Sequence, residues 1–376
     1  MTASFAPDIV LLAEYIDSAA WTPNERIVEL ALAFAGRGRS VLMAADGADH
    51  LPALDVAGVR VWRRNKTRGQ RQLQPRAFRD WADALPRLVE QRYGVRAPIV
   101  STVWLASGDV HCPIGPSITS QAIEQVLSKL CSPPALAAFV YERAWLPRAA
   151  MLERATRTSS PQILHLPIAS ALPKLTEAER DAIARRVRTV LGVRADERLV
   201  VVAGTHPDQP GVEHALRALA KADSPPLVIV LPGMLAYKLR TTALDAGLSV
   251  TGSEDARHRA VCIGGTRSMG ELLAAADLAV VTKPGRRMAK HCLGRFCADA
   301  VRSGVPIVAE AGSPGIELAH EDAIHIVADA SDWPDAVGGA SDASWLKRAK
   351  AAAWLRRDAA DIGRQLDAIE SAAGLS

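Results

Sequence analysis

The feature of this sequence that most constrains its fold is an alternation of short apolar runs with helical segments, which occurs twice along the chain. Residues 8–13 (DIVLLA) form a continuous apolar run, as is typical of a parallel strand that is buried on both faces. Residues 25–36 follow with apolar side chains at helical spacing, and residues 40–44 (SVLMA) form the next apolar run. A strand, a helix and a second strand of these lengths predict a right-handed βαβ crossover.

The same alternation restarts in the second half of the chain, with an apolar run at residues 198–203 (RLVVVA). Two series of this kind predict an α/β protein with two Rossmann-like domains, residues 1–170 and 171–376, that face each other across a cleft. The chain ends in two predicted helices, at residues 344–357 and 358–373. These C-terminal helices are candidates for crossing back to the first domain.

Length, composition and cysteine spacing exclude several classes of protein. A chain of 376 residues, of which 49% are hydrophobic and 23% charged, has the size and composition of a two-domain globular protein. It has neither an apolar stretch long enough for a membrane span nor a basic region and apolar block typical of a secretory signal. The five cysteines form no CxxC pair, which favours a reducing compartment, the cytoplasm, and argues against a zinc site.

The net charge of +4 owes much to residues 63–79, which contain seven basic residues and no acidic one. One interpretation is a solvated loop and helix face, as most charge runs are. The other is a site for an anionic acceptor, or a peripheral contact with an anionic membrane surface. Nucleic acid is not expected as a partner, because the stretch lacks the interleaved aromatic pattern that stacks on bases.

The most informative segment lies between residues 275 and 318. A strand, a basic loop and a helix are followed there by the sequence GVPIVAEAG, and the whole resembles the donor-site region of family 4 glycosyltransferases. The positions in register with that family are Gly294, Gly304, Val305, Pro306, Val308, Ala309 and Gly312. The resemblance implies a GT-B fold and retaining transfer of a sugar from a nucleotide-sugar donor. It implies no cofactor besides that substrate and no obligatory metal.

The resemblance also implies roles for individual residues. In the family, two glutamates separated by seven residues contact the donor sugar and the ribose, and His291 and Asp299 stand at the matching positions of this chain. His291 and Gly294 would then contact the sugar, and Leu293 is a further residue predicted to bind the donor. Asp299 keeps a carboxylate that can accept hydrogen bonds from the ribose diol. A loop histidine without a ligand is the alternative for His291.

The chain departs from the family where the donor diphosphate is normally held. Thr205 and Pro210 stand where the family carries an arginine and a lysine, and a diphosphate without cations would be poorly compensated. Residues 283–290 (KPGRRMAK) supply four cations and Gly285 between a predicted strand and a helix N-terminus, a setting that favours phosphate. A solvated basic loop is the alternative. The predicted phosphate ligands are Lys283, Arg286, Arg287 and Lys290.

On the predicted acceptor side the resemblance is weaker. Residues 25–43 resemble the first crossover of the family, but the two glycines that usually precede it are missing and Asn24 stands nearby, as a ligand contact or a helix cap. Asp109 and His111 are candidates for contact with the acceptor or the reacting sugar. A turn cap and a buried histidine are their structural alternatives. The residues predicted to act in catalysis are His111, Arg287, Lys290 and His291.

Two other functions stay open at this point. The departures from the family favour a non-catalytic GT-B protein that binds a sugar or nucleotide, or acts as a scaffold. A GT-B enzyme that cleaves or epimerises a sugar nucleotide is the third hypothesis. The sugar, the nucleobase, the oligomeric state and the acceptor, which could be a glycan, a lipid-linked molecule or a protein, are not specified by the sequence.

Overall fold

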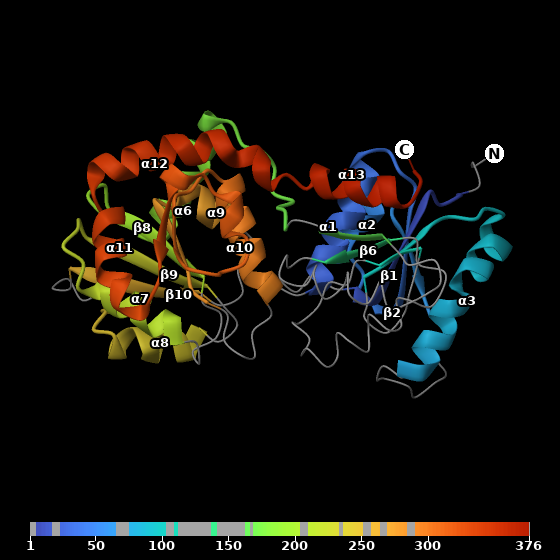
Figure 1. Cartoon of the computed structure of the whole chain (residues 1–376), viewed down its shortest axis with the longest axis horizontal. Coiled ribbons are helices and arrows are strands. Elements are labelled where there is room, and N and C mark those ends of the chain that lie inside the picture. Colours follow the sequence, from blue (N-terminus) through green and yellow to red (C-terminus); the bar gives the residue numbers. More distant parts are fainter. Residues whose placement is uncertain are drawn as a thin grey trace. The chain divides into compact units, whose positions relative to one another are not determined.

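The computed structural model describes the chain in these ranges: residues 5–16, 23–64, 75–102, 109–111, 137–140, 162–165, 168–203, 210–232, 236–250, 257–263, 269–283 and 290–375. The chain divides into two units, which we call unit 1 (Met1–Pro167 with Ile362–Ser376) and unit 2 (Ile168–Asp361) (Figure 1). The predicted boundary after residue 170 lies three residues from the observed one.

Unit 1 contains a parallel sheet whose described strands have the order β3-β2-β1-β4-β5-β6-β7. The strands are β1 (Ile9–Ile16), β2 (Val41–Ala48), β3 (Arg60–Arg63), β4 (Ile99–Ser101), β5 (Val110–His111), β6 (Ala137–Val140) and β7 (Gln162–His165). The described helices are α1 (Pro23–Gly36), α2 (Pro52–Val56), α3 (Pro75–Tyr93) and α13 (Gly363–Ala372).

Both faces of β1 are buried, which explains its continuous apolar sequence. Ile9, Leu11 and Ala13 belong to a core formed with α1 and α13. Val10 and Leu12 point to the opposite face, where they pack with residues of α3. Helices thus cover both faces of the sheet, as expected for a doubly wound domain (Figure 1).

The C-terminal helix α13 belongs to unit 1 and lies beside α1 (Figure 1). Leu366 and Ile369 of α13 are buried in the same core as α1. Polar contacts fix the pair further, because Arg26 donates a hydrogen bond to the side chain of Gln365, and Glu370 pairs with Arg37 at 2.8 Å. The end of the chain therefore returns to the N-terminal sheet.

Unit 2 contains a second parallel sheet, with described strands in the order β10-β9-β8-β11-β12-β13. The strands are β8 (Arg198–Ala203), β9 (Leu227–Pro232), β10 (His258–Ile263), β11 (Leu278–Val281), β12 (Ile307–Glu310) and β13 (Ile324–Val327). The described helices are α6 (Glu177–Val190), α7 (Pro210–Ala220), α8 (Ala236–Asp245), α9 (Met269–Ala275), α10 (Lys290–Arg302), α11 (Trp333–Ala340) and α12 (Ala343–Arg356). Short 3-10 turns lie at Ile316–Leu318, Glu321–Ala323, Ala330–Asp332 and Arg357–Ala360.

These two parallel sheets with their helices confirm the predicted α/β class. The single helix predicted over residues 358–373 is wrong, because a 3-10 turn ends at Ala360 and α13 begins at Gly363. Asp361 between them is extended, and its backbone forms a parallel bridge with Ser170. The chain leaves unit 2 at this break. In the part of the chain that the structure describes, no helix is both long and apolar enough to cross a bilayer.

Asp277 connects four elements of unit 2. Its carboxylate, directly before β11, accepts hydrogen bonds from the N–H of Leu199 at 2.8 Å, Arg188 Nη1 at 2.9 Å and Lys350 Nζ at 2.6 Å. These partners come from β8, α6 and α12. Burial acts to raise the pKa of Asp277, but the adjacent cations and hydrogen bonds outweigh it and hold the pKa below its ordinary value. Asp277 is therefore an ionised group in a largely buried position.

Candidate functional site

The sheet of unit 2 has a topological switch point between β8 and β11. From β8 the chain proceeds through β9 and β10 on one side, and β11 then pairs on the other side of β8. In doubly wound sheets, ligands bind outside the carboxyl ends of the strands at such a point. Thr282, the residue after β11, is fully buried, and its hydroxyl lies 3.5 Å from the carbonyl oxygen of Ala203 at the end of β8. The carboxyl ends of β8 and β11 therefore lie side by side.

A carboxylate that the motif comparison did not single out lies at this edge. Glu310 ends β12, is 9% exposed, and accepts a hydrogen bond from the backbone N–H of Lys283. The same carboxylate lies against the first turn of α7, since a Cβ built on Gly211 would come within 2.6 Å of its Oε2. Gly211 thus leaves space for Glu310, and the positive end of the helix dipole favours a negative charge there. The available sequence signal was its position directly after the apolar run VPIVA at residues 305–309.

The predicted phosphate loop begins just after β11. Lys283 leaves β11 with its side chain exposed, and α10 begins at Lys290, so the intervening segment leads directly into a helix N-terminus. Lys290 and His291 form the first turn of α10, but their side chains lie outside the described part of the structure. Four other predicted donor residues, Thr205, Gly285, Arg286 and Arg287, also lie outside the described ranges. The phosphate and sugar roles of all these residues stay predictions.

Leu293 and Gly294 have packing roles within unit 2. The side chain of Leu293 is fully buried, which leaves only its backbone for a donor contact. A Cβ on Gly294 would collide with Ile168 and would lie 3.3 Å from Pro314. Gly315 opposite has a φ of 86°, and a Cβ there would meet the carbonyl oxygen of Gly294 at 2.9 Å. Close packing therefore accounts for these glycines, and the predicted contact with the donor sugar remains untested.

Asp299 is buried inside unit 2, with 3% of the residue exposed. Its Oδ1 accepts a hydrogen bond of 2.6 Å from the Ser170 hydroxyl, and its Oδ2 lies 3.5 Å from Arg295 Nε. This pairing joins α10 to the segment that enters unit 2. A structural role is thus established for Asp299, and its contact with a ribose stays a prediction.

The predicted acceptor residues lie in different places in unit 1. Asp109 precedes β5, and its carboxylate accepts a hydrogen bond of 2.8 Å from the N–H of Ile99, the first residue of β4. This is the amino-terminal edge of the sheet, opposite the ligand-binding edge, so the placement favours the structural alternative for Asp109. His111 ends β5 at the carboxyl edge, but its side chain is outside the described residues. The side chain of Asn24 is likewise outside them; α1 begins at Pro23, which places Asn24 inside the first turn and not at the predicted cap.

A polar row at the carboxyl ends of β1, β2 and β3 was not anticipated. Glu14 of β1 lies opposite Asp46 of β2, because the residues on either side of the two are paired across the strands. Arg64, which directly follows β3, lies opposite Asp46 on the other side of β2. Such partners share one face of the sheet. Arg64 Nε donates a hydrogen bond of 2.6 Å to Asp46, and both side chains are largely buried. Arg64 Nη2 is buried and has no hydrogen-bond partner among the described residues.

Glu14 and Asp46 differ in their electrostatic surroundings. Burial, and next the negative charge of Asp46, raise the pKa of Glu14 above its ordinary value. Asp46 has the Arg64 guanidinium as an ion-pair partner. When two neighbouring carboxyls have different environments, one can hold a proton while the other accepts one. The row therefore has the chemistry needed to contact a hydroxyl group. Among the residues that the structure describes, no group of three or more His, Cys, Asp or Glu is arranged to hold a metal ion.

Comparison with known proteins finds likeness at the level of structure. The chain is similar to WaaG, a glycosyltransferase involved in lipopolysaccharide biosynthesis, with a TM-score of 0.69, 14% identity, and 97% of this chain and 100% of that chain covered. It is similar to sucrose-phosphate synthase from Thermosynechococcus elongatus, with a TM-score of 0.63, 17% identity, and 98% of each chain covered. For Anabaena Alr3699/HepE in complex with UDP-glucose, the TM-score is 0.61, the identity 14%, and the coverage 96% of this chain and 98% of that chain.

No protein-family model matches the chain, and no curated protein matches it. At these identities the structural likeness shows the fold, which is the two-domain GT-B architecture. Because nearly the whole of each chain is covered, the likeness extends to both units.

Proposed function

We propose that this protein transfers a sugar from a nucleotide-sugar donor to an acceptor hydroxyl. The observation that carries the proposal is the switch point of unit 2, where the exposed Lys283 follows β11 by two residues and a cation-rich sequence precedes the N-terminus of α10. The GT-B architecture supports it, since the similar Anabaena protein was crystallised with UDP-glucose. The family resemblance of residues 275–318 further supports retention of the anomeric configuration.

In the proposed reaction, the bond between the anomeric carbon and the diphosphate breaks, the acceptor oxygen bonds to that carbon, and the proton of the acceptor hydroxyl passes to the departing diphosphate. Negative charge grows on the departing phosphate oxygen, and cations fixed beside it lower the barrier. Lys283, Arg287 and Lys290 would supply that charge, so that no metal ion is required. Glu14 is our candidate for contact with the acceptor hydroxyl, because its carboxyl lies at the ligand-binding edge of unit 1 with a raised pKa.

Calorimetric titration of the whole chain with UDP, GDP and ADP tests the proposal directly. We expect at least one nucleotide to bind in the micromolar range, and we expect the matching nucleotide sugar to release its nucleotide when a hydroxyl acceptor is supplied. Turnover of the donor with no acceptor other than water would favour the sugar-nucleotide cleaving hypothesis instead. A folded sample that binds none of the three nucleotides would contradict the proposed function.

Glu310→Gln should increase the affinity for a nucleoside diphosphate about three- to tenfold. The substitution keeps an oxygen that can accept the hydrogen bond of the Lys283 N–H, and it removes a negative charge from the edge where we place the diphosphate. One charge pair in a largely hydrated site contributes on the order of 1 kcal/mol, which corresponds to roughly a fivefold change in affinity. The measurement is the dissociation constant of the nucleoside diphosphate for the parent protein and for Glu310→Gln, at low and at high salt. An affinity that falls would show that Glu310 binds the donor itself. An affinity that does not change would show that Glu310 is remote from the diphosphate.

A further inference from the structure

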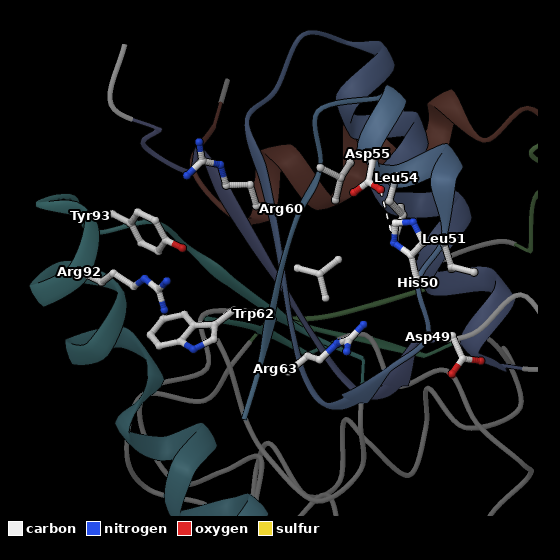
Figure 2. A pocket seen from close by; sticks show the side chains of 12 residues that line it. Asp49, His50, Leu51, Leu54, Asp55, Arg60, Trp62, Arg63, Arg92 and Tyr93 are labelled. Carbon is white, nitrogen blue, oxygen red and sulfur yellow. Dashed lines mark ion pairs between the residues drawn. The ribbon is translucent and has the colours of Figure 1, made fainter. Parts of the chain in front are cut away.

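A cavity of about 620 Å³ lies along β3 in unit 1, and three arginines are among the residues that line it (Figure 2). Arg60 and Arg63 leave opposite faces of the strand, because their positions differ by an odd number of residues. Figure 2 shows the side chain of Arg63 on the side of Asp49, away from those of Arg60 and Arg92. Such charges protect an edge strand from pairing with another chain, and they do not converge on one ligand. A polar cluster whose members contact one another lies instead at the start of unit 2.

Residues 168–172, with which the chain enters unit 2, pack against α10 and α9. The side chain of Ile168 fills the space over Gly294 of α10, where an added Cβ would collide with it. Leu172 likewise fills the space over Gly270 of α9, where a Cβ would lie 2.6 Å from the Leu172 Cδ2. Two helical glycines thus allow the entering segment to approach both helices closely.

Polar contacts hold the same segment to the later turns of α10. The Ser170 hydroxyl donates a hydrogen bond of 2.6 Å to Asp299 Oδ1, and Arg302 Nε donates one of 3.1 Å to the carbonyl oxygen of Leu172. Ser170 is fully buried, and Asp299 and Arg302 are 3% and 8% exposed. Hydrogen bonds to charged groups are the strong ones in proteins. With the contact at Gly294, they follow α10 over about 12 Å, the rise of eight helical residues.

The segment with which the chain leaves unit 2 joins this arrangement. Asp361 forms a parallel bridge with Ser170, whose N–H donates a hydrogen bond of 2.7 Å to the carbonyl oxygen of Ala360. Arg302 Nη2 lies 2.5 Å from the Asp361 carboxylate, and its Nη1 lies 3.2 Å from Asp358. Arg302 therefore connects both segments to the last turn of α10. Together the entering and leaving segments form what we call the junction, residues 168–172 and 358–361.

The first turn of α10 belongs to the proposed donor site. The helix begins at Lys290, one of the proposed phosphate ligands, and continues to Arg302. A helix transmits a displacement along its axis, because its backbone hydrogen bonds keep it nearly rigid. A donor phosphate held at the start of α10 would therefore be mechanically connected to the junction, which is held at the later turns.

The surroundings of Asp299 favour an action through the helix over a direct contact with the ribose. Its Oδ1 accepts the hydrogen bond of the Ser170 hydroxyl, and its Oδ2 lies 3.5 Å from Arg295 Nε. Both oxygens of the carboxylate thus have partners inside unit 2. The residue is also almost fully buried, which leaves little of its surface for a ligand.

We propose that Ser170, Asp299 and Arg302 are positioning residues for the donor site: they fix α10 to the junction, and a nucleoside diphosphate bound at the first turn of α10 steadies the junction in return. This inference rests on the proposed function. The effect operates in both directions because a coupling free energy between two sites is reciprocal. Asp299 then acts on the donor through α10 and not through the ribose.

The first test is calorimetric titration of the whole chain with UDP, GDP and ADP, and with the 2′-deoxy form of whichever nucleotide binds. We expect Ser170→Ala and Asp299→Ala each to weaken both forms about tenfold and to leave the ratio of the two affinities unchanged. Ser224→Ala is the matched control, because Ser224 is buried in unit 2 and its hydroxyl donates to the carbonyl oxygen of Pro225. It should bind like the parent protein.

Two outcomes of the titration overturn the proposal. If the difference between the ribose and deoxyribose forms disappears in Asp299→Ala alone, Asp299 contacts the ribose directly. If Ser170→Ala binds the nucleotide as tightly as Ser224→Ala does, the junction has no influence on the donor site. Thermal melting of each variant checks that the fold is retained.

Hydrogen exchange measured by mass spectrometry is the second test. The nucleotide should slow exchange in the junction of the parent protein and of Ser224→Ala, and should not slow it in Ser170→Ala. Without any nucleotide, Ser170→Ala should speed exchange in the junction and in α10 together, and Ser224→Ala in neither. Faster exchange in the junction with α10 unchanged overturns the positioning role, as does a bound nucleotide that leaves the junction of the parent protein unaffected.

Failure of the proposed function is distinguishable from failure of this inference. If none of the three nucleotides binds, the proposed function fails, and with it the effect of the donor on the junction. The nucleotide-free exchange of Ser170→Ala and Ser224→Ala still decides whether the junction holds α10. If a nucleotide binds but the two variants behave alike, the proposed function stands and the positioning role is overturned.

Discussion

Asp277→Ala should destabilise unit 2 by about 3–5 kcal/mol, the range observed when one partner of a buried ion pair is removed. The substitution leaves the charges of Arg188 and Lys350 without their anion and deprives the Leu199 N–H of its acceptor. Because these partners lie in β8, α6 and α12, the loss weakens the sheet and two helices together. Hydrogen exchange of β8 and β11, followed by mass spectrometry at increasing urea, reports on unit 2 without interference from unit 1.

The control is Asp196→Ala, since Asp196 and its partner Arg194 are both about two-thirds exposed. Exposed pairs contribute little, so this variant should exchange like the parent protein. The pH dependence provides a further check. Since the folded-state pKa of Asp277 is lowered, its ionic contribution is present above the ordinary aspartate pKa and is lost as the pH falls through the folded-state pKa. Equal exchange in Asp277→Ala and Asp196→Ala near neutral pH would contradict a stabilising role.

Simultaneous replacement of Lys283, Arg287 and Lys290 by alanine should reduce sugar transfer by at least about a hundredfold. Removal of a single group that stabilises developing negative charge typically reduces turnover by about a hundred- to a thousandfold. Ground-state affinity for the donor should fall as well, because the diphosphate is charged before the reaction begins. The measurements are the initial rate of nucleotide release and the dissociation constant of the nucleotide.

The control for this variant removes the same charge elsewhere in unit 2. Arg185, Lys347 and Arg356 are exposed on α6 and α12, away from the carboxyl ends of the strands. Their triple alanine variant should retain both affinity and turnover, apart from a small long-range effect that salt screens. If the two triple variants behave alike, general positive charge, and not the loop before α10, is responsible for donor binding.

Strands that are buried on both faces could be predicted from the sequence. The apolar runs at residues 8–13 and 198–203 correspond to β1 and β8, because interior strands of parallel sheets need apolar side chains on both faces. By contrast, β5 has only two residues, too few for any periodic pattern. Helix α6 contains no fully buried residue, so apolar spacing does not reveal it. Its capping box, formed by Thr176 and Glu179, is the sequence signal that identifies its start.

The candidate sites depend more strongly on register and packing. Glu14, Asp46 and Arg64 are far apart in sequence and come together only through the alignment of three strands. The position of Glu310 against Gly211 depends on where α7 begins. A motif search finds residues that are near one another in the chain, such as those from Lys283 to Lys290. It does not find groups that tertiary structure assembles.

The return of the C-terminal helix to the first unit has a consequence for biosynthesis. Leu366 and Ile369 emerge from the ribosome after the strands of both sheets, although they fill the same core as Ile27 and Leu30 of α1. The apolar surface of unit 1 that α13 covers therefore stays exposed until α13 has been synthesised. Unit 2 (Ile168–Asp361), by contrast, can fold as soon as it emerges. Chaperones should recognise α1 during this interval, and C-terminal truncation before residue 363 should damage the N-terminal unit and spare the one nearer to the cut.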